Sequence, residues 1–226
     1  MDRPAPWRCT ALDQRNAVKS KPVVLIDYEA GNLTSVRRAL DYLGVSCRIV
    51  TLGDELRDAE RIIFPGVGHA GAAMATLKAR GLDVALRDAF ARGVPILGIC
   101  LGAQIVLTHS EEGDTPCLDL IPGECLRFRL SDPQLKVPHM GWNEIEVIRP
   151  HPVLRDVQPG DEFYFVHSYY PNPRSGAQVF ATCEYGITFP VAIGYMNLFA
   201  TQFHPEKSGR IGLAILRNFA SWDGKH

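Results

Sequence analysis

PILGICLGAQ, residues 95–104, is an apolar run that turns at Cys100 into a helical pattern. Gly98 and Gly102 stand two residues on either side of Cys100. This is the G-x-nucleophile-x-G pattern of a nucleophile elbow, a sharp strand-to-helix turn, with cysteine in place of serine. Such a crowded turn tolerates little beyond glycine at these two positions. The free N–H groups and the positive dipole end of the following helix favour a thiolate and can receive an oxyanion. The stretch predicts a nucleophilic cysteine at the end of a buried strand, against the alternative of a cysteine that only fills the core.

A histidine and a glutamate near the C-terminus supply the groups that such a nucleophile needs. In LFATQFHPEKSG, residues 198–209, the first positions alternate as in a short strand, and Pro205 keeps His204 extended. Residues two apart in an extended chain point the same way, so the Glu206 carboxylate can lie beside the His204 imidazole. The pattern predicts a triad of Cys100 as nucleophile, His204 as general base and Glu206 as the group that orients it. The alternative is a surface His-Pro-Glu turn.

A third segment ends an apolar strand in a glycine-rich turn. In IIFPGVG, residues 62–68, the glycines allow the backbone to approach a ligand closely. Ligands of open α/β sheets bind at the carboxyl ends of the strands, where this turn lies. We expect the N–H group of Val67 or Gly68 to be an oxyanion donor; the alternative is a plain strand-to-helix turn.

The order of the periodic segments predicts an α/β fold. Up to about residue 108, apolar strands alternate with helices, which implies a doubly wound, mostly parallel central sheet with helices on both faces. After Pro116 the strands alternate more strongly, and we expect them to form an antiparallel extension of that sheet. The predicted strands are 23–26, 45–50, 61–64, 95–99, 124–129, 144–148, 162–166, 178–184, 191–195 and 198–204, and the predicted helices are 33–43, 72–80, 82–92, the elbow helix to about 108, and 209–221. We expect residues 21–226 to form a single domain and residues 1–20 to be a poorly ordered extension with little function.

Composition agrees with a cytoplasmic enzyme. The chain has 226 residues, of which 46% are hydrophobic, and a net charge of −1. Because it has no basic stripe and no apolar stretch long enough to span a membrane, we expect neither nucleic acid nor a membrane as a partner. The first residues lack the apolar core of a signal peptide. The six cysteines are scattered without C-x-x-C spacing, so we expect reduced thiols, no metal site and Cys100 alone as a strongly reactive thiol.

Together these segments resemble the class I (triad) glutamine amidotransferases, in which PGVG, GICLGAQ and HPEKSG stand in the same order. The resemblance extends to one subgroup, the glutaminase subunits of imidazole glycerol phosphate synthases, and covers nearly all of residues 21–222. The motifs that carry it are DYEAGNLTSVRRAL, THSEEGD, KVPHMGWNEI and YFVHSYY. The elbow and HPE belong to the whole class, whereas PHMGWN and FVHSYY are far more specific to the subgroup.

The resemblance implies a role for each matching residue. Cys100 forms a γ-glutamyl thioester, His204 takes the thiol proton and passes one to departing ammonia, and Glu206 orients His204. The N–H groups of Leu101 and of Val67 or Gly68 form the oxyanion hole. The residues implied to bind glutamine are Gly66, Gln104, Glu111 and the backbone of His167, Ser168 and Tyr169. The residues implied to face a partner subunit are Asn32, Lys136, Pro138, His139, Met140, Gly141, Trp142 and Asn143.

In that subgroup the partner is a (β/α)8 cyclase, which receives ammonia through an internal tunnel and acts on a phosphoribulosyl-formimino nucleotide. The resemblance implies no metal or organic cofactor. The sequence departs from the usual pattern at Glu29, His69, Ala103 and Ala200, but none of these replaces a triad residue.

Three alternatives stay open. The first is another amidotransferase of the same class, serving anthranilate, aminodeoxychorismate or pyridoxal phosphate synthesis, against which PHMGWN argues. The second is a stand-alone γ-glutamyl hydrolase, which needs no partner. The third is a non-catalytic binding subunit, against which the intact triad argues.

Overall fold

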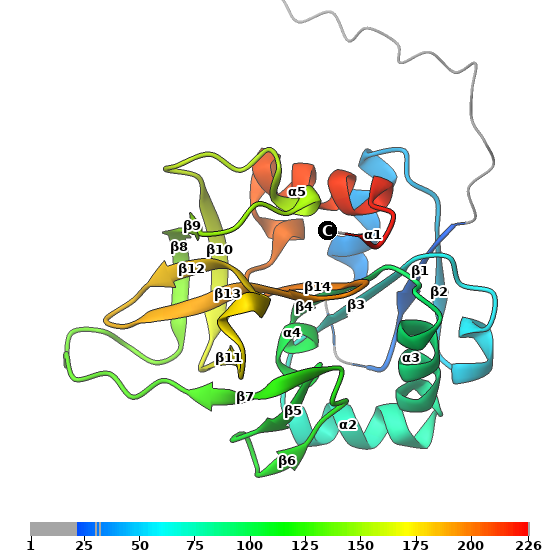
Figure 1. Ribbon diagram of the computed structural model, residues 1–226, viewed down its shortest axis with the longest axis horizontal. Coiled ribbons are helices and arrows are strands. Elements are labelled where there is room, and N and C mark those ends of the chain that lie inside the picture. The colour runs from blue at the N-terminus through cyan, green and yellow to red at the C-terminus, as the bar shows by residue number, and fades with distance from the viewer. Residues whose placement is uncertain (1–21, 30, 32, 226) are drawn as a thin grey trace, which may run out of the picture.

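A central eight-stranded sheet forms the frame of the protein. The computed structural model describes residues 22–29, 31 and 33–225, so the predicted extension 1–20 and Asn32 lie outside the described residues. The strand order is β2-β1-β3-β4-β14-β13-β12-β9 (Figure 1). The first five strands run parallel and the last three continue the sheet antiparallel. Their bounds are β1 (Val23–Ile26), β2 (Cys47–Val50), β3 (Ile62–Gly66), β4 (Ile96–Cys100), β14 (Leu198–Thr201), β13 (Thr188–Tyr195), β12 (Val179–Glu184) and β9 (Glu146–Val147).

Helices cover both faces of this sheet. The helices α1 (Leu33–Tyr42) and α5 (Gly209–Ser221) lie on one face, and α2 (Ala70–Ala79), α3 (Leu82–Ala91) and α4 (Leu101–Ile105) lie on the other (Figure 1). Successive residues of β1 enter opposite cores, since Val24 and Ile26 pack on the α2–α4 side and Val23 and Leu25 pack on the α1–α5 side. The predicted doubly wound α/β fold, with its antiparallel extension, is confirmed. The short 3-10 helices are η2 (Gly53–Leu56), η3 (Pro152–Leu154), η4 (Gly176–Gln178) and η5 (Pro205–Lys207).

Two smaller sheets stand beside the central one. In one, β8 (His139–Glu144) pairs antiparallel with β10 (Glu162–His167). The other has the order β11-β7-β5-β6, with bounds β11 (Tyr169–Pro173), β7 (Ile121–Arg127), β5 (Leu107–Ser110) and β6 (Thr115–Pro116). The prediction that strands 124–129 and 162–166 extend the central sheet is therefore wrong. The alternating pattern indicates a strand but does not identify the strand that pairs with it.

The elbow helix is shorter than predicted. It ends at Ile105 instead of about residue 108, because Leu107 and the residues after it pair with β7. The β-branched Val106 and Thr108 in this stretch weaken a helix slightly, and the strand pairing decides its structure.

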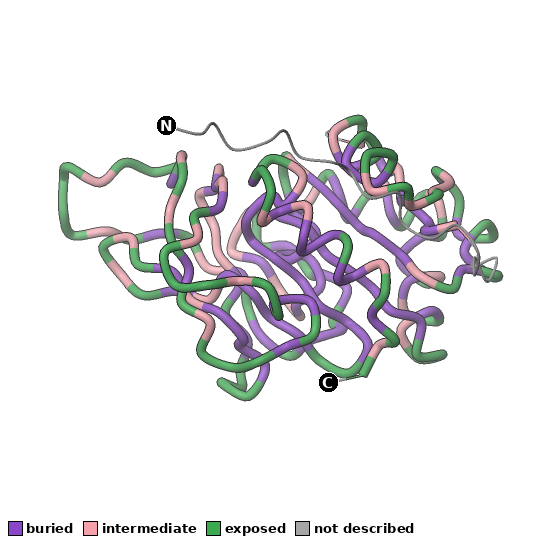
Figure 2. Tube along the Cα trace, turned by 90° about the horizontal axis from the view of Figure 1, so that it is seen from above, coloured by how far each residue is buried: buried purple, intermediate pink, exposed green. Residues whose placement is uncertain are grey.

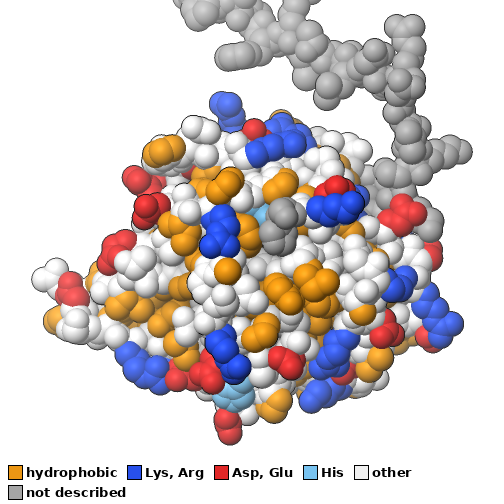
Figure 3. Space-filling view, in the orientation of Figure 1, with side chains coloured by type: hydrophobic (Ala, Val, Ile, Leu, Met, Phe, Trp, Pro, Cys, Tyr) orange, Lys and Arg blue, Asp and Glu red, His pale blue; other side chains and the backbone are white. Residues whose placement is uncertain are grey.

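The buried residues form two cores, one on each face of the central sheet, and the exposed ones lie in the surrounding loops and on outer faces of the helices (Figure 2). On the face drawn in Figure 3, acidic and basic side chains are interspersed and form no wide band of one charge. Among the described residues, the structure contains no helix of the length and apolar character that crossing a membrane requires.

Candidate active site

The predicted nucleophile sits at a strained strand-to-helix turn. Cys100 ends β4 and precedes α4, with φ 55° and ψ −106°, a conformation that non-glycine residues seldom adopt. A Cβ atom at Gly102 would lie 2.1 Å from the carbonyl oxygen of Phe64, and one at Gly98 would lie 3.0 Å from the backbone of Gly102. Close packing of α4 on β3 therefore leaves no room for a side chain at Gly102, and the position of Gly98 is tight. The predicted elbow at Cys100 is present in the structure.

The His204 and Glu206 side chains form a buried pair. The Nδ1–H of His204 donates to Glu206 Oε1 at 2.7 Å, and the two side chains are 1% and 0% exposed. Burial lowers the pKa of His204, but the neighbouring Cys100 thiolate and the Glu206 carboxylate outweigh burial and raise it to about 10. The hydroxyl of Ser208 donates to the carbonyl of His204 and fixes the backbone of this segment. His204 is thus held protonated beside the cysteine.

Sheet topology brings these distant segments to one edge. In the parallel ladder Gly66 of β3 stands opposite Cys100 of β4, and β14, which leads to His204, pairs with the other side of β4. The carboxyl ends of three neighbouring strands therefore meet, as at ligand sites of open α/β sheets. A cavity of about 270 Å³ opens there. Its lining residues are Val67, Gly68, Cys100, Leu101, Gln104, Glu112, Pro138, Val166, His167, Ser168 and Tyr169.

The predicted oxyanion donors line the same cavity as the nucleophile. Leu101 is buried as the first residue of α4, so its N–H has no partner within that helix. Val67 is half-buried, and Gly68 is exposed with φ 104°, a value that favours glycine. Gly66 lies just outside the lining, and a Cβ atom there would lie 1.8 Å from the hydroxyl oxygen of Tyr28.

Glu112, and not Glu111, faces the cavity. The side chain of Glu111 accepts from the N–H of Arg127 and pairs with Arg129 at 2.9 Å, which directs it away from the cavity. Glu112 lines the cavity and accepts from the N–H of Ala70 at 2.7 Å. Both residues lie in the turn that follows β5, a segment for which periodicity gives no facing direction. Glu111, which was predicted to bind glutamine, therefore does not line this cavity, whereas Glu112 does.

Gln202 is a site residue that the sequence reasoning missed. It is completely buried, and its Nε2 donates to the Sγ of Cys100 at 3.7 Å. Gln104, which was predicted, donates to Gln202 Oε1 at 3.1 Å and to the carbonyl of Tyr169 at 3.0 Å. The alternation in residues 198–204 places Gln202 on the same face as His204, and that signal could have found it.

The predicted partner-facing residues do not share one environment. Lys136, Pro138, Met140 and Trp142 are exposed, with Met140 and Trp142 at 63% and 53%. Gly141 and Asn143 are half-buried. His139 is 3% exposed and points into the protein, so its assignment to a partner-facing surface is wrong. The reason is the two-residue period of β8, which turns alternate side chains inward. Asn32 lies outside the described residues.

Known proteins of similar sequence identify the family of this chain. The family model "Glutamine amidotransferase class-I" matches residues 24–221. The chain belongs to the class-I glutamine amidotransferase family. Among curated relatives, "Imidazole glycerol phosphate synthase subunit HisH" of Nitratidesulfovibrio vulgaris (strain DSM 19637 / Miyazaki F) is 50% identical over 205 residues, covering 88% of this chain and 96% of the relative. The HisH protein of Moorella thermoacetica is 48% identical, and the match covers 88% of this chain and 94% of the relative.

Solved structures of other proteins share the fold. PurLQS from Thermotoga maritima superposes with a TM-score of 0.69 at 20% identity, covering 88% of this chain and 98% of the other. The glutaminase domain of Trypanosoma brucei CTPS, with bound acivicin, has a TM-score of 0.65 at 14% identity. The match covers 89% of this chain and 94% of that domain. The predicted family, its HisH subgroup and the expectation of a glutamine amidotransferase enzyme are confirmed.

The other cysteines in the described part of this glutamine amidotransferase have thiols that resist ionisation. Burial raises the pKa of Cys47 and Cys125, and raises those of Cys117 and Cys183 to about 12. The cysteines of the described part of the chain are all free thiols. Within residues 22–29, 31 and 33–225, no three His, Cys, Asp or Glu side chains gather in a way that could hold a metal ion.

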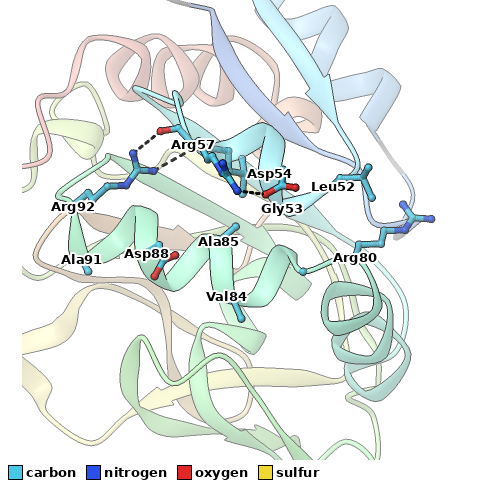
Figure 4. Close-up of a pocket in the computed structure, with 12 residues that line it drawn as sticks. Leu52, Gly53, Asp54, Arg57, Arg80, Val84, Ala85, Asp88, Ala91 and Arg92 are labelled. Atoms are coloured by element: carbon cyan, nitrogen blue, oxygen red, sulfur yellow. Dashed lines mark hydrogen bonds and ion pairs between the residues drawn. The ribbon is translucent and has the colours of Figure 1, made fainter.

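A larger hollow, of about 780 Å³, lies between η2 and α3 (Figure 4). Its arginines already have partners, since Arg57 pairs with Asp54 and Arg92 donates to the carbonyls of Leu56 and Arg57. The residues that line it include no cysteine, histidine or serine. Of these two cavities, the smaller one is lined by a cysteine, Cys100, and the larger one is not.

Proposed function

We propose that this chain is the glutaminase subunit of an imidazole glycerol phosphate synthase, in which Cys100, His204 and Glu206 hydrolyse L-glutamine to glutamate and ammonia. The observation that carries the proposal is the elbow that presents Cys100 beside the buried His204–Glu206 pair. Identity near 50% to HisH proteins, over nearly the whole of both chains, supports the choice of synthase. From the scattered cysteines we also propose the cytoplasm as its compartment.

Thioester formation is the first half of the reaction. The Cys100 sulfur attacks the carboxamide carbon of glutamine while His204 holds the former thiol proton. The carbonyl oxygen becomes an oxyanion, for which the N–H groups of Leu101 and of Val67 or Gly68 are the donors. When the carbon–nitrogen bond breaks, His204 passes its proton to the departing ammonia and becomes neutral.

Hydrolysis completes the cycle. The neutral His204 takes a proton from a water molecule, which attacks the thioester carbon. The carbon–sulfur bond breaks, glutamate leaves, and the Cys100 thiolate returns beside a protonated His204. Glu206 stabilises the charged imidazole in both halves and holds its Nδ1–H in one orientation. No step requires a metal or an organic cofactor.

The cavity offers groups for the amino-acid end of glutamine. Glu112 supplies a negative charge and Gln104 an amide, and both line the cavity together with Cys100. We propose that these side chains, with the backbone of residues 167–169, hold the ammonium and carboxylate groups of the substrate. This places the carboxamide end at the sulfur.

A cyclase subunit is the proposed partner. We propose that this (β/α)8 barrel docks on the surface that carries Met140 and Trp142, together with Lys136 and Pro138. Exposed methionine and tryptophan side chains of this size are typical of protein interfaces. Ammonia released at Cys100 then enters the cyclase directly instead of reaching solvent, and the cyclase forms imidazole glycerol phosphate and an aminoimidazole carboxamide ribonucleotide.

The decisive experiment measures glutamate release from glutamine. It uses the chain alone, and then the chain with the matching cyclase and its nucleotide ligand. Low activity alone and strong stimulation in the complex are expected. Equal turnover in both would indicate a stand-alone hydrolase, and no turnover in either would reject the proposed reaction. Loss of activity after alkylation of Cys100 by a glutamine analogue serves as the control for the nucleophile.

A further inference from the structure

Two buried histidines stand directly opposite each other on the paired strands β8 and β10. His139 and His167 are register partners, and His139 Nδ1 lies 3.1 Å from His167 Nε2. The ring of His139 stacks on Phe165 at 4.9 Å and on Tyr185 at 4.1 Å between centroids. The triad mechanism uses neither imidazole, although His167 lines the cavity at Cys100.

Hydrogen bonding determines the tautomer of both rings. The carbonyl oxygen of Tyr169 only accepts, so His167 Nδ1 must carry the proton that it donates over 2.8 Å. In a neutral ring His167 Nε2 is then an acceptor, and the Nδ1–H of His139 must donate to it. Burial lowers the pKa of His139 to about 4 and that of His167 to about 3, so both rings are neutral at pH 7. Asn143, whose Nδ2 lies 3.5 Å from His139 Nε2, is the outermost member of this series of hydrogen bonds, which runs from Asn143 through the two histidines to Tyr169.

The series continues to the nucleophile. The same Tyr169 carbonyl accepts from Gln104 Nε2 at 3.0 Å, and the other hydrogen of that NH2 group goes to Gln202 Oε1 at 3.1 Å. Gln202 Nε2 then donates to Cys100 Sγ. Both N–H groups of Gln104 are thereby used. Its Oε1 is not used by these bonds, Gln104 lines the cavity, and an acceptor there suits the ammonium group of an amino acid.

We infer that the His139–His167 pair is a positioning device, which holds Gln104 with its amide oxygen available to the substrate ammonium group and links β8 to the glutaminase site. The identity of that substrate rests on the function proposed above. The link matters because Met140 and Trp142, on the other side of β8, belong to the proposed docking surface. A shift of β8 on docking would move the His139 donor, and through it the amide of Gln104.

Substitution of His139 tests the inference in the complex with the cyclase. His139→Leu removes the donor to His167, and His139→Gln retains an N–H group. We expect His139→Leu to raise the KM for glutamine about tenfold, the effect of about 1.4 kcal/mol of lost binding, with kcat within about twofold. We expect His139→Gln to return KM to within about threefold of wild type. The matched control is His151→Leu, since His151 is equally buried but packs on Phe199 and Trp222 away from the cavity. It should leave KM unchanged.

Nitrogen-15 NMR of the histidine rings provides a readout that does not depend on activity. The wild-type chain should show His139 and His167 as Nδ1–H tautomers. In His139→Leu, His167 should stay Nδ1–H because the Tyr169 carbonyl still accepts from it, but the nitrogen-15 shift of its Nε2 should change because that atom loses its donor. Nε2–H tautomers in the wild type, or an unchanged KM in His139→Leu while wild type is active, would overturn the inference. If the wild-type complex releases no glutamate, the proposed function fails instead, and the tautomers still test the hydrogen-bond series. An equal rise of KM in His151→Leu would mean that general loosening of the core is responsible.

Discussion

Gly66 lies opposite Cys100, at a point where the Tyr28 hydroxyl leaves no room for a side chain. A Cβ atom at Gly66 would lie 1.8 Å from Tyr28 Oη and 3.0 Å from Tyr28 Cζ. Tyr28 is 2% exposed, and Oη has no hydrogen-bond partner within the described part of the chain. Because overpacking a tight core costs about 1–3 kcal/mol, we expect Gly66→Ala to lower the free energy of unfolding by about 2–3 kcal/mol. The melting temperature should fall by about 4–12 °C.

A double-mutant cycle isolates the contact. Tyr28→Phe removes a buried hydroxyl without a partner, so by itself it should raise the free energy of unfolding by about 1 kcal/mol. In the Tyr28→Phe background the closest atom to the new methyl group is Cζ. Gly66→Ala should therefore lower the free energy of unfolding by at least about 1 kcal/mol less than it does in the wild-type background. Urea unfolding followed by circular dichroism measures all four proteins. Gly176→Ala is the control, since its Cβ would meet nothing within 4 Å. Additivity of the two substitutions to within about 0.5 kcal/mol would refute the reasoning.

Three further predictions concern the triad and the buried histidines. Cys100→Ala should abolish glutamate release and, by removing the thiolate, lower the pKa of His204 from about 10 toward its ordinary value; an NMR titration in which the value does not move would contradict this. Glu206→Gln should reduce kcat by about 10²–10³-fold with little change in KM, because the charged imidazole loses its carboxylate; steady-state kinetics in the complex measures it, and a loss confined to KM would contradict it. For His139 and His167 the folded pKa values, about 4 and about 3, lie below the ordinary 6.5, so the unfolded chain binds more protons in acid. Stability should therefore fall as the pH drops from 6.5 toward 4, by up to about 1.4 kcal/mol per pH unit for each histidine. Urea unfolding at several pH values tests this, and His139→Leu should have the shallower slope.

Features of the site that depend on neighbours in the chain could be predicted. The elbow follows from Gly98 and Gly102 around Cys100, because this spacing is the local signature of a sharp strand-to-helix turn. The His204–Glu206 pair follows from a two-residue spacing in extended backbone. In both cases the chain geometry over a few residues places the groups together.

Features that depend on strand pairing could not be predicted. Residues 107–110 form a strand because they pair with β7. In the turn that follows, contacts with distant residues place the two glutamates: Glu111 is held by Arg127 and Arg129, and Glu112 lines the cavity. PHMGWN was recognised as a motif, but its register against β10 decides that His139 points inward while Met140 and Trp142 are exposed. A one-residue change of register would reverse these environments.

By itself, the sequence determined the class of fold, the family resemblance and the nature of the three reacting groups, since periodicity and short spacings express local backbone geometry. Only the tertiary structure decided which polar side chains stand behind Cys100. Gln202 and Cys100 are 102 residues apart in the chain and in contact in the fold. His139 and His167 meet across two strands, at a distance of 28 residues in sequence. Such contacts arise when strands from separate parts of the chain are brought together at one sheet edge, and no local pattern of residues contains that information.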